Sequence, residues 1–372
     1  MTNMCYHPWV GLDITPQGEF RPCCKYSHFI ADNLSDYQNS SELKELQNQF
    51  LQGQRPERCK RCWDDEDANL PSKRQLDWQY VFHSKAPDIK SIKILSLPFG
   101  NSCNLACRTC NSASSSGWIS ESEKLRKYFP DIKIYKHQRF YQDEKFINEI
   151  KNISSDLIHV EFPGGEPFLA GVNEHLDFLD FLILNDSKNT SLHYMTNASI
   201  FPDDRFWVRW EKFKKVDIQL SIDGIYNQFE YMRWPAVWSS VENNVKSYIN
   251  KKSNNIQISL SHTVSIFNVF YLPEFIKWCL QNKLGKPYLG MVSSPKMYSI
   301  KALPQQVKET LGKKLDRFTF KEIVNYMYSE DLNEEFAGAI KHIHALDQQR
   351  NQSFNETFPE FYNILKDAGC QI

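Results

Sequence analysis

The sequence predicts an α/β fold built on a parallel sheet, and three observations lead to this prediction. From Ile92 onward, short β-rich runs alternate with segments of helical spacing. Six strand-and-helix units follow one another, a number that suits a barrel or part of one. Glycine, asparagine, serine and cysteine stand directly after the runs, where the loops of a β/α barrel carry its chemistry. Turns explain most of these residue types, but they do not explain the cysteines or Glu166.

The expected strands and helices alternate along the middle of the chain. The strands are Ile92–Leu97, Leu157–Phe162, Ser191–Thr196, Val216–Ile222, Ile256–Val264 and Pro287–Val292. Helices are expected between them, for example at Val172–Leu184, Val237–Asn250 and Leu272–Gln281.

Three parts are predicted: residues 1–88, 89–295 and 296–372. The last part has helical patterns and either caps the open mouth of the barrel or is an appendage without a catalytic part. Its expected helices are Gln305–Phe318, Phe320–Tyr328 and Glu334–Gln349.

The first part contains one clear helix. Leu43, Leu46 and Phe50 give it an apolar face. A serine at position 40 or 41 suits its N-cap, and Gly53 suits its end.

Composition excludes several classes of protein. The 372 residues are 41% hydrophobic and 24% charged, with a formal net charge of −1, as in an ordinary globular protein. Without a block of Lys or Arg, charge gives no support to nucleic acid as a partner. The longest apolar stretches, such as Phe178–Leu184, are too short to cross a bilayer. The N-terminal residues lack the pattern of a signal peptide, so we expect no membrane association and a cytoplasmic location.

The cysteines are clustered. Ten are present, and eight of them lie in the first third of the chain, at Cys5, Cys23, Cys24, Cys59, Cys62, Cys103, Cys107 and Cys110. Because the cytosol keeps thiols reduced, such clusters indicate metal binding rather than disulfides. Cys279 and Cys370 stand alone and are interpreted as packing or surface thiols.

The spacing Cys103-x3-Cys107-x2-Cys110 places three thiolates in a loop after the first strand. Soft thiolates select iron–sulfur clusters or zinc. A structural zinc site needs four ligands, so three leave one position open, and zinc with a distant fourth ligand is the alternative.

These motifs resemble those of the radical S-adenosylmethionine (radical SAM) superfamily. The cysteine loop resembles its signature, and Gly164-Gly165-Glu166-Pro167 after the second strand is similar to its glycine-glycine-glutamate motif. Ser221-Ile-Asp-Gly followed by Glu230-Tyr-Met-Arg233 is similar to the fourth-strand region of its SPASM/Twitch branch. The resemblance covers roughly residues 92–295 and implies a partial (β/α)6 TIM-like barrel.

The resemblance also implies a cofactor site. Cys103, Cys107 and Cys110 would hold a 4Fe–4S cluster whose open iron binds S-adenosylmethionine, and cleavage of the sulfonium gives a 5′-deoxyadenosyl radical. The contacts that it implies are Gly164 and Gly165 beside the methionine moiety, Glu166 on its ammonium group, Arg233 on its carboxylate, and Asn197, Ser221 and Asp223 on the carboxylate or ribose. A satisfied turn or helix cap is the alternative for each polar residue.

The chain departs from the family at Thr109, where an aromatic residue usually stands near the adenine. Adenine contacts are then expected elsewhere, at backbone groups near Ser265 and Phe267.

A second set of four cysteines lies in residues 1–88. Gly18 allows a tight turn that brings Cys5 and Cys23 together on a hairpin-like segment, and Cys59-x2-Cys62 supplies the other pair. Cys24 is an alternative ligand to Cys23. The basic residues beside Cys59 and Cys62 would favour thiolates.

This second pattern resembles the Twitch domain, a small cysteine-rich unit whose four cysteines ligate an auxiliary 4Fe–4S cluster. In this chain the pattern precedes the barrel instead of following it. A zinc ribbon offers similar cysteine pairs and is the competing interpretation.

The leading hypothesis is a radical SAM enzyme that abstracts a hydrogen atom and completes a net oxidation, making it an oxidoreductase or a peptide-modifying enzyme. Its expected partners are a peptide, protein or small-molecule substrate and an electron donor such as flavodoxin or ferredoxin. The rival hypothesis is a non-catalytic metal-binding adaptor with a zinc ribbon and a degraded barrel. The sequence names neither the substrate, nor the outcome of the reaction, nor a catalytic residue.

Overall fold

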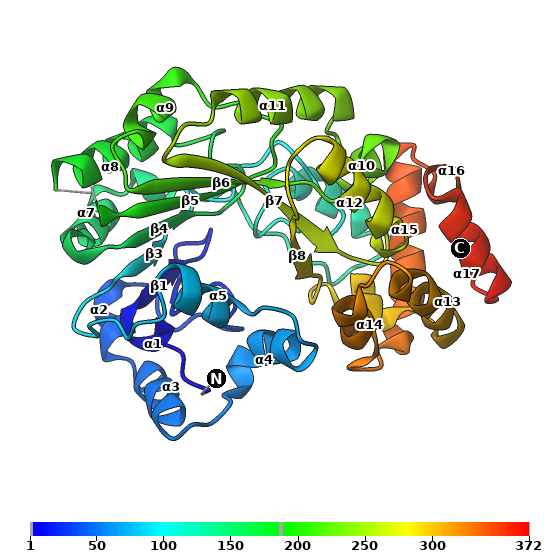
Figure 1. Cartoon of the computed structure of the whole chain (residues 1–372), viewed down its shortest axis with the longest axis horizontal. Coiled ribbons are helices and arrows are strands. Elements are labelled where there is room, and N and C mark those ends of the chain that lie inside the picture. The colour runs from blue at the N-terminus through cyan, green and yellow to red at the C-terminus, as the bar shows by residue number, and fades with distance from the viewer. Residues whose placement is uncertain (1–2, 186–188, 372) are drawn as a thin grey trace.

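The computed structural model describes residues 3–185 and 189–371. The outermost residues of the predicted parts 1–88 and 296–372 therefore lie outside the described residues. One eight-stranded sheet forms the centre, in the order β2-β1-β3-β4-β5-β6-β7-β8 (Figure 1). Its strands are β1 (Gly11–Ile14), β2 (Phe20–Arg21), β3 (Ile94–Ser96), β4 (His159–Phe162), β5 (Ser191–Thr196), β6 (Lys215–Ser221), β7 (Ile256–Val264) and β8 (Tyr288–Met291).

The sheet is parallel from β1 to β8, and only the β1–β2 pair is antiparallel. It does not close, because β2 and β8 are its two edges. The α/β class and the open, barrel-like sheet are thus confirmed. All six predicted strands are present, and Ser191–Thr196 and Ile256–Val264 have the predicted bounds.

Helices lie on both sides of the sheet. Figure 1 shows α8, α9 and α11 along one side and the N-terminal helices along the other. The middle helices are α6 (Trp118–Leu125), α7 (Glu144–Asn152), α8 (Val172–Leu184), α9 (Asp204–Trp210), α10 (Tyr226–Met232), α11 (Trp238–Lys251) and α12 (Leu272–Gln281).

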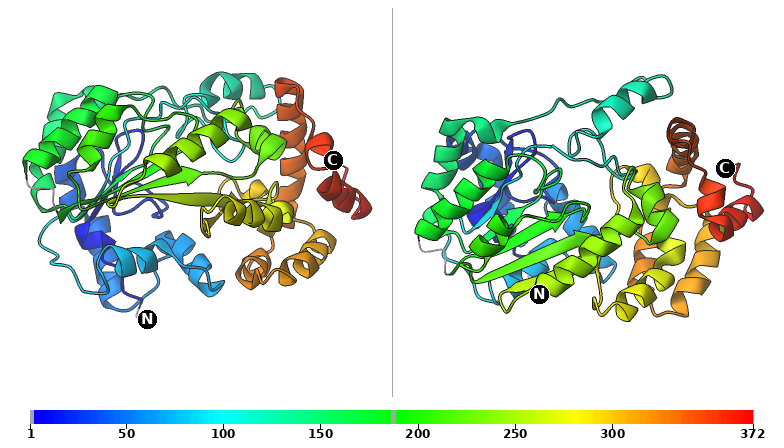
Figure 2. Two further views of the ribbon diagram at one scale, coloured as in Figure 1. Left: turned by 45° about the horizontal axis from the view of Figure 1, so that its top comes forward. Right: turned by 90° about the horizontal axis from the view of Figure 1, so that it is seen from above.

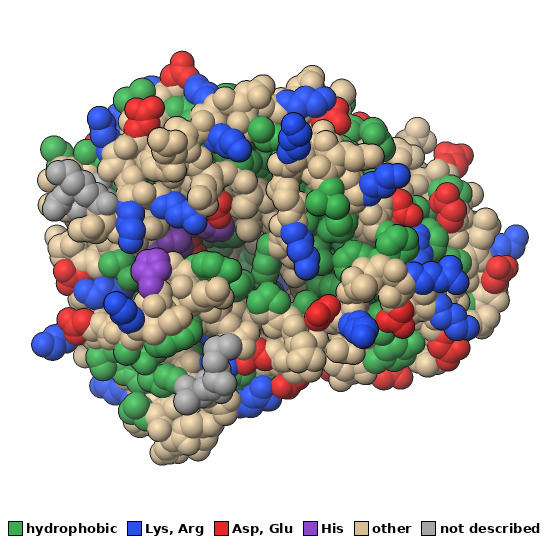
Figure 3. Space-filling model, viewed as in Figure 1, with side chains coloured by type: hydrophobic (Ala, Val, Ile, Leu, Met, Phe, Trp, Pro, Cys, Tyr) green, Lys and Arg blue, Asp and Glu red, His purple; other side chains and the backbone are tan. Residues whose placement is uncertain are grey.

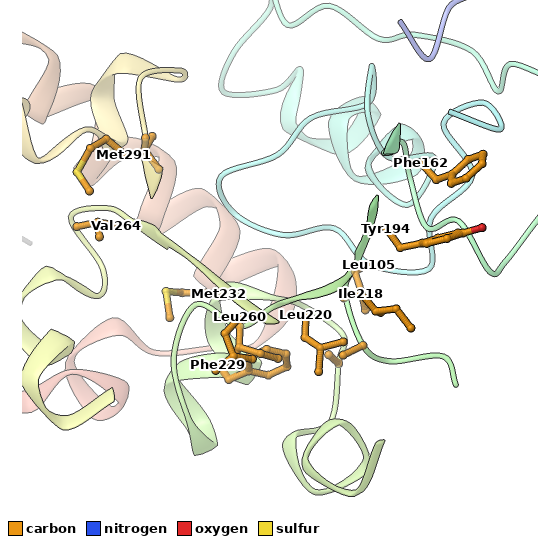
Figure 4. Close-up of a cluster of buried hydrophobic side chains, with 14 of the residues drawn as sticks. Leu105, Phe162, Tyr194, Ile218, Leu220, Phe229, Met232, Leu260, Val264 and Met291 are labelled. Carbon is orange, nitrogen blue, oxygen red and sulfur yellow. The ribbon is translucent and has the colours of Figure 1, made fainter. Parts of the chain in front are cut away.

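The core lies between the sheet and these helices. Alternate residues of β5 and β6 are buried, as strand geometry requires for a sheet covered mainly on one face. Tyr194, Ile218 and Leu220 belong to this buried set, and Phe229 and Met232 of α10 join it (Figure 4). The polar alternate positions of the same strands face away from these helices.

The N-terminal residues build part of the sheet as well as their own small core. The predicted hairpin is present as β1 and β2, with Gly18 at φ +87° in its turn. The predicted helix is α3, with Ser40 as its N-cap and Leu43, Leu46 and Phe50 buried. The N-terminal helices are α1 (His7–Val10), α2 (Leu34–Asn39), α3 (Ser41–Leu51), α4 (Lys60–Asp67) and α5 (Lys73–Tyr80).

Strand β1 pairs in parallel with β3, so the sheet continues across the predicted boundary between residues 88 and 89. The sequence analysis did not anticipate this strand. The division into parts remains a prediction.

The C-terminal residues are helical, as expected, and lie at one end of the molecule (Figures 1 and 2). Their helices are α13 (Gln305–Asp316), α14 (Lys321–Tyr328), α15 (Phe336–Arg350), α16 (Phe354–Thr357) and α17 (Pro359–Asp367). Short 3-10 helices lie at Glu57–Cys59, Phe140–Gln142, Ser154–Asp156, Val269–Tyr271, Lys296–Tyr298, Ile300–Ala302 and Asn333–Glu335. Ala345 and Leu346 of α15 pack with Ala106 and Trp118 beside the first cysteine loop.

Candidate functional site

The loop after β3 brings the first three cysteines together. Burial raises the pKa of Cys107 to about 11, and Arg233 opposes this shift while Cys103 adds to it. Burial also raises the pKa of Cys110 to about 12, with Cys107 and Cys103 as neighbouring contributors. The three thiols are therefore close enough to influence one another's ionisation. A positive metal centre would offset these pKa shifts, because it stabilises thiolates.

Hydrogen bonds to the loop backbone fix its path. Ser116 Oγ accepts from Cys103 N at 3.1 Å, and Trp118 Nε1 donates to Cys107 O at 2.9 Å. Gly100 opens the loop at φ +74°, where a Cβ would lie 2.2 Å from Gln138 O. A side chain at position 100 is thus excluded both by the backbone conformation and by space.

The glycine motif packs directly on the cysteine loop. A Cβ on Gly165 would lie 2.0 Å from Ser102 O, and one on Gly164 would lie 2.9 Å from Pro98 Cβ. Glu166 N donates to Ser102 O at 2.7 Å, which joins the two loops. The structure thus gives these glycines a packing role. Their predicted approach to a methionine moiety remains a prediction.

Glu166 is buried, and the end of β5 orients its carboxylate. It accepts from Thr196 Oγ1 and Asn197 N, both at 2.8 Å. Burial raises its pKa to about 7, although these hydrogen bonds oppose the shift. The Asn197 side chain donates to Asn104 Oδ1 at 3.1 Å and lies 3.7 Å from Cys103 Sγ. Glu166 and Asn197 are therefore positioned beside the cysteine loop.

Arg233 and Asp223 pair with each other. Arg233 Nη2 lies 2.7 Å from Asp223 Oδ2, and Arg233 Nη1 lies 3.9 Å from Cys107 Sγ. The buried Arg233 Nε has no hydrogen-bond partner among the described residues. Asp223 Oδ1 also accepts from Thr263 N at 2.8 Å. Ser221 ends β6 opposite Ser261, on the half-buried face of the sheet.

The positions expected to serve adenine are deeply buried. Ser265 N donates to Asn268 Oδ1 at 2.8 Å, and Phe267 N donates to Ser265 Oγ at 3.3 Å. The Phe267 ring packs edge-on against Tyr298, with centroids 4.7 Å apart. Both backbone N–H groups are therefore already used within the protein.

The second set of cysteines lines one cavity with about 320 Å³ of space not filled by atoms. Cys5, Cys23, Cys59 and Cys62 all belong to its lining. Burial raises the pKa of Cys59 to about 12, with Cys62 as the next cause. Cys24 is absent from the lining, and its charged neighbours are Lys73, Asp13, Glu161 and Lys25. This arrangement favours Cys23 over Cys24 as a ligand.

The positive charges at this cavity differ from those that the sequence suggested. Lys25, Lys73 and Arg74 line it. Arg58 is instead paired with Glu42 at 3.3 Å, and Lys60 with Asp64 at 2.7 Å. Lys25 follows Cys23 and Cys24 directly, whereas Lys73 and Arg74 lie more than ten residues from any cysteine and carry no local sequence signal.

Helix α15 holds the first cysteine loop through residues that the sequence analysis missed. The Arg108 guanidinium lies 3.6 Å from the Tyr231 ring centroid and donates to Asp347 and to Gln352 Oε1. Arg350 donates to Ala106 O at 2.7 Å. Because Arg108 and Asp347, like Ala106 and Arg350, lie more than 230 residues apart in sequence, no motif links them.

Within the described residues, no three His, Cys, Asp or Glu side chains have the close spacing that a single metal ion requires. No helix in this described part of the chain is long and apolar enough to cross a membrane.

Comparison with known proteins finds a relative in sequence. The chain is 24% identical over 172 residues to a cysteine-type anaerobic sulfatase-maturating enzyme of Clostridium novyi (strain NT). This relationship confirms the resemblance to the SPASM/Twitch branch of the radical SAM superfamily. The match covers 46% of this chain and 41% of the relative, so it spans less than half of either protein. No protein-family model matches the sequence.

Solved structures give weaker likenesses. anSMEcpe with bound AdoMet has a TM-score of 0.46 at 18% identity, covering 63% of this chain and 62% of that one. SuiB of Streptococcus suis bound to S-adenosylmethionine has a TM-score of 0.38 at 12% identity, covering 78% and 51%. Both TM-scores lie below 0.5, so these likenesses add nothing to the sequence relationship.

Proposed function

We propose that this chain is a radical SAM enzyme that oxidises a residue of a peptide or protein. Cys103, Cys107 and Cys110 hold its catalytic 4Fe–4S cluster. When cluster and S-adenosylmethionine are bound, they supply a 5′-deoxyadenosyl radical. The observation that carries the proposal is the meeting of two loops, in which the three thiols lie beside Glu166 and Asn197.

The residues where the cysteine loop contacts the glycine motif each have a specific role in the proposal. Glu166 accepts a hydrogen bond from the ammonium group of the methionine moiety, because its carboxylate is already oriented by β5. Arg233 keeps a buried positive charge beside Cys107 and offers its unpaired Nε to a carboxylate. Gly164 and Gly165 keep the two loops in contact.

Cys5, Cys23, Cys59 and Cys62 hold an auxiliary 4Fe–4S cluster in the proposal. Four thiols around one cavity fill every iron position of such a cluster, and the lysines and arginine at the cavity offset its negative charge. A fully ligated cluster can hold the unit together or carry electrons, and the second task suits a net oxidation. A small donor such as flavodoxin or ferredoxin supplies the reducing electron to the catalytic cluster.

A peptide or protein substrate is favoured over a small molecule because the sequence relative is named a sulfatase-maturating enzyme of the cysteine type. A peptide that carries one cysteine is therefore the first substrate to test.

The test is cleavage of S-adenosylmethionine by anaerobically reconstituted protein under dithionite. Wild type should form 5′-deoxyadenosine slowly without substrate. Cys107→Ala should form none, and Cys370→Ala, a control outside both cysteine sets, should match wild type. Iron-loaded wild type that forms no 5′-deoxyadenosine would contradict the proposal.

A further inference from the structure

A row of polar side chains crosses the face of the sheet that is turned away from α8, α9 and α11. The strand register places Asp13 beside Ser96, Ser96 beside Glu161, Glu161 beside His193, and His193 beside Asp217. Neighbours in such a row lie roughly 5 Å apart, because that is the spacing between strands. Five neighbouring strands thus each place one polar side chain at the same level of the sheet: three carboxylates, one hydroxyl and one imidazole.

Within this row, His193 and Asp217 are joined by a hydrogen bond. His193 Nδ1 lies 3.0 Å from Asp217 Oδ2, and the two side chains are 18% and 25% exposed. Burial alone would raise the pKa of Asp217, but the hydrogen bond and charge of His193 hold it below its usual value. An ionised Asp217 accepts the proton of Nδ1, which leaves Nε2 of a neutral imidazole as a free acceptor. This is the arrangement of an oriented general base.

The pair lies between the two cysteine sets. Lys73 lines the cavity of the N-terminal cysteines and also contacts Glu161, the neighbour of His193 in the row. In the other direction, Asn197 directly follows β5 and lies four residues after His193, roughly 13 Å away at the rise of a strand. Figure 3 shows histidine side chains at a hollow between the sheet and the N-terminal helices.

The remaining charged groups around His193 are already paired or lie farther away. The His159 ring centroid is 6.3 Å from that of His193, and His159 Nε2 faces Glu161 at 3.7 Å. Lys73 is engaged by Glu161 and Asp77. In the described row, the His193 ring is therefore hydrogen-bonded to a carboxylate and also partly exposed.

The oxidation in the proposed function needs a proton acceptor. Converting a carbon that bears a hydrogen and a thiol or hydroxyl group (HC–XH) into C=X removes one hydrogen atom, one electron and one proton. S-adenosylmethionine and its cluster, when held at Cys103, Cys107 and Cys110, would supply the acceptor for the hydrogen atom, and a cluster held by Cys5, Cys23, Cys59 and Cys62 would supply the acceptor for the electron. The X–H bond breaks, and its electron pair forms the second C–X bond. The proton needs a base on the protein.

We propose that His193, oriented by Asp217, accepts this proton from a thiol- or hydroxyl-bearing side chain of the peptide substrate. The inference rests on the proposed function and adds to it the base and the face of the sheet where the substrate side chain lies. His193 acts as the catalytic residue, and Asp217 as the positioning residue that fixes its tautomer.

The experiment compares His193→Gln, Asp217→Asn and the exposed control His344→Gln on holoenzyme carrying both clusters. The probes are two synthetic peptides that differ only in a single cysteine or serine. The readouts are 5′-deoxyadenosine, peptide product, the KM for peptide and the equilibrium Kd of the peptide. The last readout is independent of turnover.

We expect His193→Gln to lower kcat for product by 10²-fold or more, the usual contribution of a general base. KM and Kd should stay within about twofold of wild type, and 5′-deoxyadenosine should still form, uncoupled from product. Asp217→Asn preserves shape but donates to Nδ1, which moves the proton to Nε2, so it should show the same defect. His344→Gln should match wild type.

Four results would overturn the inference. Normal product formation by His193→Gln removes His193 as the base, and a loss of peptide binding in that variant makes it a binding residue instead. A normal kcat in Asp217→Asn removes the positioning role. Wild type that forms 5′-deoxyadenosine but no product from either peptide refutes the substrate class. Wild type that forms no 5′-deoxyadenosine instead refutes the proposed function itself.

Discussion

Replacing Asp347 with alanine tests whether helix α15 holds the first cysteine loop. Arg108, inside that loop, has a fully buried side chain, and the Asp347 side chain is 14% exposed. Asp347 also accepts from Tyr231 Oη and from Phe354 N, both at 2.8 Å. Removing the carboxylate leaves a buried guanidinium without its counter-charge and two donors without an acceptor.

Breaking a buried ion pair by removing one partner costs about 3–5 kcal/mol. We therefore expect Asp347→Ala to lower the free energy of unfolding by that amount and to reduce the iron retained at Cys103, Cys107 and Cys110. Urea unfolding followed by circular dichroism, with iron determined on the same samples, measures both effects. Glu242→Ala is the matched control, because its ion pair with Lys246 is an exposed helical pair worth about 0.5 kcal/mol or less. Equal stability of the two variants would refute the role assigned to α15.

Three further predictions concern the cofactor site, the second cluster and pH. Glu166→Ala should weaken binding of S-adenosylmethionine by about 1.5–3 kcal/mol, measured as Kd; an unchanged Kd would remove Glu166 from the site. Cys59→Ala should still form 5′-deoxyadenosine but lose product, when the catalytic cluster is shown to be intact; normal product yield would make the N-terminal unit a scaffold. Burial lowers the pKa of His175 to about 3 and those of His262 and His342 to about 4. Because the unfolded chain binds these protons first, the contribution of these histidines to stability should be constant above pH 6.5 and fall below it, by about 2 kcal/mol per histidine at pH 5. His175→Asn should flatten this dependence between pH 6.5 and 5, and an unchanged slope would contradict the assignment.

Local patterns in the sequence predicted the strands and the motifs well. The runs from Ile92 to Val292 became strands because their β-rich composition and their spacing agreed with the parallel sheet. The cysteine loop and the glycine motif meet because the carboxyl ends of parallel strands share one edge of the sheet. Strands and loop motifs of this kind depend on short stretches of the chain, so the local sequence is enough to predict them.

Features that depend on distant contacts were not visible. Strand β1 is four residues long and belongs to the sheet only through its pairing with β3. Arg108 and Asp347 carry no pattern that joins them, and His193 and Asp217 look like ordinary polar positions of half-buried strands. The register of the sheet, which sequence periodicity does not give, is what brings such residues together.

The central claim is that two sets of cysteines hold two iron–sulfur clusters. The most direct test is the iron, sulfide and zinc content of anaerobically reconstituted protein, with and without the triple substitution of Cys103, Cys107 and Cys110 by alanine. Wild type should carry about eight irons, as two four-iron clusters, and the triple variant about half of that. Wild-type protein that binds zinc and no iron would contradict the account.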